Sequence, residues 1–150
     1  MGACIGSSFA LALAAATPER ITSVVLINPI GRTATNADGM RQHFREWARE
    51  IAPRHSELDP SIVRTVGERL WGADFVYSTS RETVERLPTP LLILPGSDDM
   101  HPREIALEIA SLSRNARIVE DWWGDRGRQR LAIADFLMSR TPSSADPSKR

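Results

Sequence analysis

Two short apolar runs without alternation constrain the fold of this chain more than any other feature of its sequence. Residues 23–29 contain Val-Val-Leu-Ile and residues 90–96 contain Leu-Leu-Ile-Leu. Strands with one solvated face alternate apolar and polar residues, whereas strands of a parallel sheet are covered on both faces and are apolar throughout. Both runs are therefore predicted to be buried strands of a parallel sheet.

Helices are predicted around these strands. Residues 7–17 are rich in small, strong helix formers, and Pro18 ends the segment because its ring cannot continue the hydrogen-bond ladder. Residues 105–112 and 131–138 are expected to be helices, and residues 116–122 a third strand. Alternation of helix and strand is typical of a parallel sheet with helices on its faces, so the fold class is α/β.

Residues 31–87 interrupt this alternation. Apolar residues recur there at helical spacing among many charges, which predicts two or three amphipathic helices with little strand. Asp59 followed by Pro60 is typical of a helix cap with a first-turn proline. The apolar positions are Met40, Phe44, Trp47, Ala48, Ile51, Ile62, Val66, Leu70 and Trp71.

The pentapeptide at residues 2–6, Gly-Ala-Cys-Ile-Gly, fits the pattern of a nucleophile on a sharp turn from strand to helix. Such a nucleophile has a strained backbone, and the two glycines leave room where side chains would collide. The positive end of the following helix is expected to favour the thiolate form of a cysteine at this position, and the N–H of Ile5 would form half of an oxyanion hole. The pattern alone equally fits a buried structural cysteine in a glycine-rich turn.

The order of segments after this turn resembles the α/β-hydrolase superfamily. A helix of small residues, a Thr-Pro-Glu-Arg turn at residues 17–20 and an apolar strand follow one another as they do in that family. The resemblance covers residues 2–138 and implies a partial α/β-hydrolase fold, a remnant of the parallel sheet flanked by helices. It also implies attack on a carboxylic ester or thioester by Cys4, since some relatives, such as dienelactone hydrolases, use a cysteine.

The segment at residues 90–102 is similar to the late strand and acid loop of this family. There a Gly-x-x-Asp places a carboxylate at the end of the strand, and a proline begins the next helix. By this resemblance Asp99 is the acid that orients an imidazole, and Asp98 is the second choice. Either aspartate could instead only cap the helix near Pro102.

The histidine that completes the family's site is missing from its usual loop. Residues 122–127 read Trp-Trp-Gly-Asp-Arg-Gly, and Asp125 stands where the histidine is expected. His101 in the acid loop is the alternative base, although it equally fits a surface position. A cysteine nucleophile depends less on such a base than a serine does, because a thiol ionises by itself.

The resemblance divides the chain into a core at residues 1–30 and 88–140 and a helical cap or lid at residues 31–87. The polar composition of residues 141–150 predicts a disordered tail. Cap aromatic residues are expected either to line a pocket for an apolar acyl group or, more often, to fix the cap to the core. These aromatic residues are Trp47, Trp71, Phe75 and Tyr77.

A complete α/β-hydrolase has further strands before the nucleophile turn, where this sequence begins. The sheet is therefore expected to keep three strands, to lack the strand that enters the turn, and to leave the helix at residues 7–17 partly uncovered. An open sheet edge and exposed apolar area favour self-association. Met1 could be an internal methionine of a longer protein, or the gene could be truncated.

Composition excludes several classes of partner. The 19 basic and 19 acidic residues give a net charge of zero, so nothing electrostatic favours nucleic acid or a membrane as partner. A single cysteine excludes an intrachain disulfide and is typical of the cytoplasm. Three histidines and one cysteine show no metal-ligand spacing, and no cofactor is implied.

The sequence thus predicts a cytoplasmic hydrolase-family protein whose complete form cleaves an ester or thioester of a small-molecule acyl substrate. Two alternatives stay open. The chain could be a catalytically silent relative that binds a ligand or a protein, which Asp125 in place of histidine favours. It could also be a truncated gene product that is inactive alone.

Overall fold

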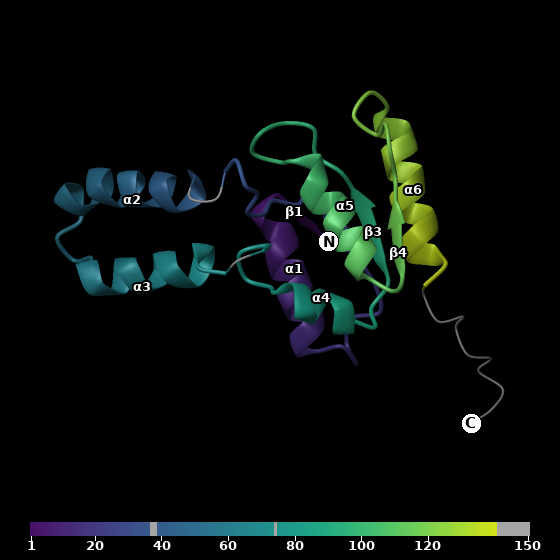
Figure 1. Ribbon diagram of the computed structural model, residues 1–150, viewed down its shortest axis with the longest axis horizontal. Coiled ribbons are helices and arrows are strands. Elements are labelled where there is room, and N and C mark those ends of the chain that lie inside the picture. Colours follow the sequence, from purple (N-terminus) through teal and green to yellow (C-terminus); the bar gives the residue numbers. More distant parts are fainter. Residues whose placement is uncertain (37–38, 74, 141–150) are drawn as a thin grey trace.

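The computed structural model describes residues 1–36, 39–73 and 75–140 (Figure 1). Its strands are β1 (Gly2–Ala3), β2 (Val24–Ile27), β3 (Leu91–Leu94) and β4 (Ala116–Ile118). Its helices are α1 (Ile5–Ala16), α2 (Gly39–Ile51), the 3-10 turn η1 (Ala52–Arg54), α3 (Pro60–Trp71), α4 (Arg81–Arg86), α5 (Arg103–Leu112) and α6 (Arg126–Met138). The tail expected at residues 141–150 lies outside the described residues.

The strands form one parallel sheet in the order β1-β2-β3-β4. Val24 pairs with Leu91 in the two central strands, which are the two apolar runs of the sequence. The prediction of a parallel α/β sheet is confirmed. The expected count of three strands is wrong, because Gly2 and Ala3 pair with the end of β2 and add a fourth strand to the described part of the sheet.

The sheet separates two apolar layers. On one face, side chains of β2 and β3 such as Leu26 and Ile93 pack with α1, α4 and α5. On the other face, Val25 and Leu92 pack against Phe136 of α6. Figure 1 shows α6 on the opposite side of the sheet from α1 and α5. Successive strand residues point to opposite faces, so burial on both faces explains the absence of alternation in the two apolar runs.

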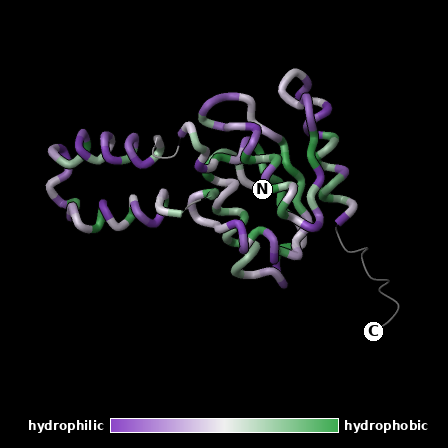
Figure 2. Tube along the Cα trace, in the orientation of Figure 1, coloured by the Kyte–Doolittle hydropathy of each residue, from purple (hydrophilic) through white to green (hydrophobic). Residues whose placement is uncertain are grey.

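The insertion at residues 31–87 has two parts. Helices α2 and α3 lie side by side as a hairpin that projects from the body, and neither helix contains a fully buried residue (Figure 1). Figure 2 shows polar and apolar residues mixed along both helices, as expected for amphipathic segments. Asp59 accepts a hydrogen bond from the Ser61 N–H at 2.7 Å, which confirms the cap predicted before Pro60.

The second part of the insertion packs on the body. Phe75 and Val76 are each 1% exposed and belong to the core cluster that also contains Leu11 of α1. The aromatic residues of the insertion therefore divide: Phe75 and Tyr77 are buried, whereas Trp47 stays 51% exposed on the hairpin.

Helix α1 is covered by the rest of the described chain on only one of its sides. Leu11 and Ala14 are buried, but Phe9 and Leu13 are 45% and 55% exposed. Strand β1 lies at one end of the strand order and pairs only with β2 among the described strands. The helix is thus partly uncovered, as the sequence predicted. Across the described residues, none of the helices combines the length and apolar character that crossing a bilayer requires.

Candidate active site at the carboxyl edge of the sheet

Cys4 occupies the sharp turn between β1 and α1. Its backbone φ is 53° and ψ is −126°, a region that L residues rarely adopt and that costs about 1–3 kcal/mol. The Cys4 N–H donates to the Ile27 carbonyl at 3.0 Å, and its own carbonyl accepts from the Ser7 N–H at 3.0 Å. The predicted strained conformation at the nucleophile position is confirmed.

The two glycines that flank this turn are not equivalent. A Cβ on Gly2 would lie 2.0 Å from the Gly6 carbonyl oxygen, so the close approach of β1 to α1 requires glycine there. A Cβ on Gly6 would meet no atom within 4 Å. The expectation that both glycines relieve collisions is therefore wrong for Gly6, which faces a side of α1 that no described residue covers.

Substituting these glycines one at a time should give opposite changes in stability. Gly2→Ala is expected to lower the free energy of unfolding by about 1–3 kcal/mol, because backbone atoms must move apart. Gly6→Ala is expected to raise it by about 0.4–1 kcal/mol, because alanine is the better helix former in an open position. Urea denaturation followed by circular dichroism measures both. Equal destabilisation by the two variants would contradict the described turn.

Hydroxyl groups of α1 hold the turn in place. Ser7 Oγ donates to the carbonyls of Gly2 at 3.0 Å and Ile27 at 3.3 Å, which ties the start of the helix to β1 and β2. Ser8 Oγ donates to the Val76 carbonyl and lies 2.6 Å from Ser78 Oγ. Sequence reasoning missed both serines, although two adjacent hydroxyls directly after a nucleophile turn are a signal for such contacts.

The acid loop brings Asp98 and His101 together. The Nδ1 atom of His101 lies 2.9 Å from Asp98 Oδ1, and the N–H of His101 donates to the same oxygen at 2.8 Å. These contacts, led by the backbone hydrogen bond from His101, hold the pKa of the Asp98 carboxyl below its usual value. Asp99 is exposed, and its backbone carbonyl is 3.5 Å from Asn36 Nδ2.

This geometry changes the order of the two candidate acids. Asp98, the second choice by resemblance, is the carboxylate that contacts an imidazole in this structure. Neither aspartate caps α5, since Pro102 occupies the cap position and no side chain bonds there. His101 is also less exposed than a plain surface histidine, at 19% of its side chain.

The loop stands at the end of β3, two strands away from Cys4. A Cβ on Gly96 would lie 2.1 Å from the His101 carbonyl oxygen, so the loop folds back tightly over the strand end. Adjacent strands are about 4.8 Å apart, which places the ends of β1 and β3 about 10 Å from each other. Among the described residues, no hydrogen bond joins Cys4 to His101 or Asp98.

Two further residues lie at this edge outside the predicted catalytic set, although Tyr77 is one of the cap aromatic residues expected to line a pocket. Asn28 follows β2 with a positive φ of 47°, and its Oδ1 atom is buried without a hydrogen-bond partner. Tyr77 is 2% exposed, and its hydroxyl lies 3.5 Å from the Gly31 carbonyl oxygen. Burial raises the pKa of Tyr77; the charge of Arg32 opposes this rise and the charge of Cys4 adds to it. Tyr77 therefore belongs to the surroundings of Cys4.

The loop in which the family's histidine is expected has a structural role here. Asp125 Oδ1 accepts from the N–H groups of Gly127 at 2.8 Å and Arg128 at 3.0 Å, and so caps α6. This cap explains why α6 begins at Arg126, earlier than predicted. Trp122 and Trp123 stack at 4.1 Å between ring centroids, and both indole nitrogens donate to the Pro95 carbonyl.

Comparison with known proteins identifies the fold. No protein-family model and no curated protein matches the sequence. A meta-cleavage product hydrolase from Pseudomonas fluorescens IP01 is similar in structure, with a TM-score of 0.59, 18% identity, and coverage of 92% of this chain and 63% of that one. A bromoperoxidase described as non-heme from Mycobacterium tuberculosis H37Rv has a TM-score of 0.59 and 16% identity, covering 94% and 66%.

An α/β-hydrolase enzyme from a Medee basin deep-sea metagenome library has a TM-score of 0.62 and 16% identity, covering 98% of this chain and 66% of that one. These likenesses show that the chain has an α/β-hydrolase fold and that it is a partial one, since it spans just under two thirds of each of these structures. The resemblance inferred from the sequence is confirmed at the level of the fold.

Proposed function

We propose that this protein hydrolyses carboxylic esters or thioesters of small acyl substrates, with Cys4 as the nucleophile. The observation that carries the proposal is the strained backbone of Cys4, at φ 53°, on the turn that leads into α1. Strain of this kind persists only where the surrounding structure enforces it, and it is concentrated at functional sites. The fold adds support, since two of the structures described above are named as hydrolases.

The first half of the reaction forms an acyl enzyme. The Cys4 thiolate attacks the carbonyl carbon, and the Ile5 N–H, at the first position of α1, donates to the oxyanion that develops. The tetrahedral intermediate collapses with cleavage of the bond to the alcohol or thiol. That leaving group takes a proton from His101, and the acyl group stays on the sulfur of Cys4.

The second half releases the acid. His101 accepts a proton from water, the resulting hydroxide attacks the thioester carbon, and the carboxylic acid leaves as the Cys4 thiolate re-forms. Asp98 contacts Nδ1 of His101 and so leaves Nε2 for this proton transfer. For these steps the loop at residues 96–101 must approach Cys4. We propose that substrate binding brings about this movement of the loop.

Trapping the acyl enzyme tests the proposal. Cys4 is the only cysteine of the chain, so an acyl group on sulfur can have only one position. Incubation with p-nitrophenyl acetate should add one acetyl group, detected by intact-mass spectrometry and located by peptide mapping on residues 1–20. Cys4→Ala should remain unmodified on that segment. Equal acetylation of the wild type and the variant there would contradict a nucleophilic Cys4.

A catalytically silent binding protein is the second candidate function, and the role of Asp125 favours it. That residue caps α6 where the family carries its base, so this loop supplies no imidazole to the site. The same trapping experiment separates the two candidates, because a silent site leaves the mass unchanged at neutral pH.

Three further assignments accompany the proposal. We propose that residues 31–87 serve as the cap of the enzyme and that the open edge of β1 takes part in self-association. We also place the protein in the cytoplasm, because a free thiol nucleophile needs a reducing compartment.

A further inference from the structure

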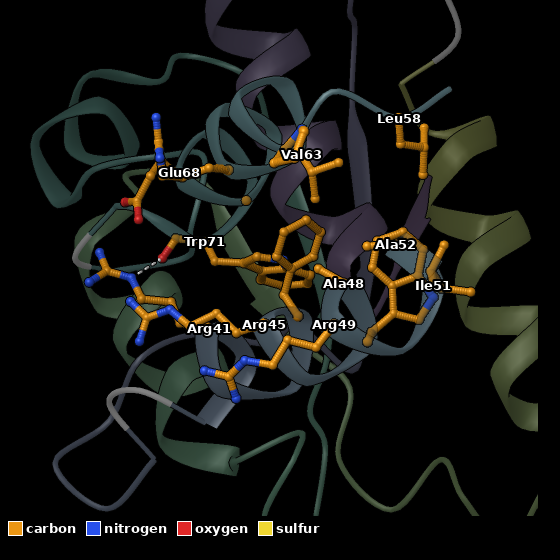
Figure 3. A pocket seen from close by; sticks show the side chains of 15 residues that line it. Arg41, Arg45, Ala48, Arg49, Ile51, Ala52, Leu58, Val63, Glu68 and Trp71 are labelled. Atoms are coloured by element: carbon orange, nitrogen blue, oxygen red, sulfur yellow. Dashed lines mark hydrogen bonds between the residues drawn. The ribbon is translucent and has the colours of Figure 1, made fainter. Parts of the chain in front are cut away.

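A groove between α2 and α3 is lined by none of the candidate catalytic residues, and only its Trp71 ring reaches the neighbourhood of Cys4, where it packs edge-on against Tyr77 at 5.1 Å between centroids. It encloses about 360 Å³, and its lining comes only from residues 41–71 (Figure 3). This volume falls in the range of about 300–1,000 Å³ that is usual for small-molecule sites. The apolar part of the lining includes the rings of Phe44, Trp47 and Trp71, and the first two pack at 5.5 Å between centroids.

One polar atom of this apolar lining lacks a partner. The indole Nε1 of Trp71 is buried and donates to no atom of the described chain. A buried N–H without an acceptor costs about 1–3 kcal/mol, so a ligand acceptor that reaches this atom when the side chains covering it shift would be favourable here. The backbone carbonyl of Trp71 is already occupied, because Arg41 Nε donates to it at 2.9 Å.

The residues of α2 that line the groove include arginines and no acidic residue, although Glu46 lies beside Arg45 and Arg49 on the neighbouring surface of the helix. Arg45 and Arg49 are one helical turn apart, and their guanidinium groups lie on the same side of the groove as that of Arg41 (Figure 3). Both are exposed and have no ion-pair partner within the described part of the chain. On α3, Arg64 and Glu68 balance each other in charge.

We propose that this groove binds a small amphipathic anion, a carboxylate with an apolar tail. The tail would cover the aromatic lining, the carboxylate would contact Arg45 and Arg49, and the Trp71 N–H would donate to one of its oxygens. A second copy of the chain fits less well. A two-fold contact through the same face brings the arginines of one copy toward those of the other.

Two-dimensional ¹H–¹⁵N spectra of the indole groups test the proposal, with octanoate as the probe. The chain has four tryptophans, of which Trp47 and Trp71 line the groove while Trp122 and Trp123 lie at the far end of the sheet. Octanoate should shift the Trp71 and Trp47 resonances in a saturable way and leave the other pair in place. Trp→Phe variants assign the signals.

The charge requirement is tested by changing the ligand and then the protein. Octanol has the same tail without charge and should bind about tenfold more weakly, as should octanoate to the Arg45→Glu/Arg49→Glu variant, given the strength of exposed ion pairs. Arg54→Glu, outside the groove lining, is the matched control and should leave octanoate binding unchanged. The substituted side chains are exposed, so all variants should keep the far-UV spectrum of the wild type.

Three results would overturn the proposal. The first is the absence of any octanoate-dependent shift at Trp71. The second is equal affinity for octanoate and octanol, which would mark the groove as merely apolar. The third is a shift of the groove resonances with protein concentration alone, together with a dimer in sedimentation, which would assign the groove to a second copy. None of these readouts involves Cys4, so the proposal stands or falls independently of the proposed hydrolase activity.

Discussion

Replacing Cys4 by alanine is expected to lower the rate of ester and thioester hydrolysis by at least about a hundredfold, because removal of a nucleophile abolishes the covalent route. What remains would be catalysis by binding and by the Ile5 N–H. The measurement is kcat/KM for p-nitrophenyl acetate and for an acetyl thioester. Unfolding in urea should show that the variant stays folded, since alanine removes only a partly exposed thiol.

Cys4→Ser is the matched control for this prediction. It keeps the shape of the side chain but replaces a group that ionises by itself with one that needs a base. In the proposed mechanism His101 acts first as the acid that protonates the leaving group, so it does not take a proton from a serine hydroxyl, and the serine variant is also expected to be nearly inert. Full activity of Cys4→Ala would contradict the nucleophile assignment. Activity of Cys4→Ser close to that of the wild type would contradict the mechanism by which the thiol acts.

Phe75→Ala is expected to lower the free energy of unfolding by about 3–5 kcal/mol, the usual cost of deleting a fully buried aromatic side chain. Phe75 is 1% exposed and belongs to the core cluster with Leu11 and Ile105. The Arg81 guanidinium lies 4.6 Å from its ring centroid, so the substitution also removes a cation–π contact. Urea denaturation measures the change.

Trp47→Ala provides the comparison, because both residues are aromatic and belong to the same insertion. Trp47 is 51% exposed on the hairpin, so its removal is expected to cost less than about 1 kcal/mol. A similar loss for both variants would mean that the hairpin is packed on the body. A small loss for Phe75→Ala would contradict the described core.

The parts of the fold that were predictable are those governed by burial. The runs Val24–Ile27 and Leu91–Leu94 are fully or largely buried on both faces of the sheet, and that environment leaves a direct pattern in the sequence. Helix α1 was predictable from small residues that allow close packing. Strand β1 was not predictable from the sequence, because a strand of two residues is too short to show a pattern. Its position depends on the adjacent turn, where the Cys4 N–H donates to the Ile27 carbonyl.

The candidate site was predictable only in part, for a different reason. Cys4 could be recognised because a strained turn demands glycine at Gly2, which is a local requirement. The choice between Asp98 and Asp99 depends on how a loop folds over Gly96, and neighbouring aspartates carry no signal for that. The environment of Tyr77 arises from contacts between segments far apart in the chain, which no spacing in the sequence reveals.

Alkylation of Cys4 is the most direct test of the central claim that this cysteine is an activated nucleophile. The chain has no other thiol, so the rate of alkylation by iodoacetamide at neutral pH reports on Cys4 alone. We predict that the folded protein reacts faster than the same chain unfolded in urea, because the N-terminal end of α1 stabilises the thiolate only in the folded state. A folded protein that reacts no faster than the unfolded chain would contradict this claim and would mark Cys4 as a structural residue or part of a silent site.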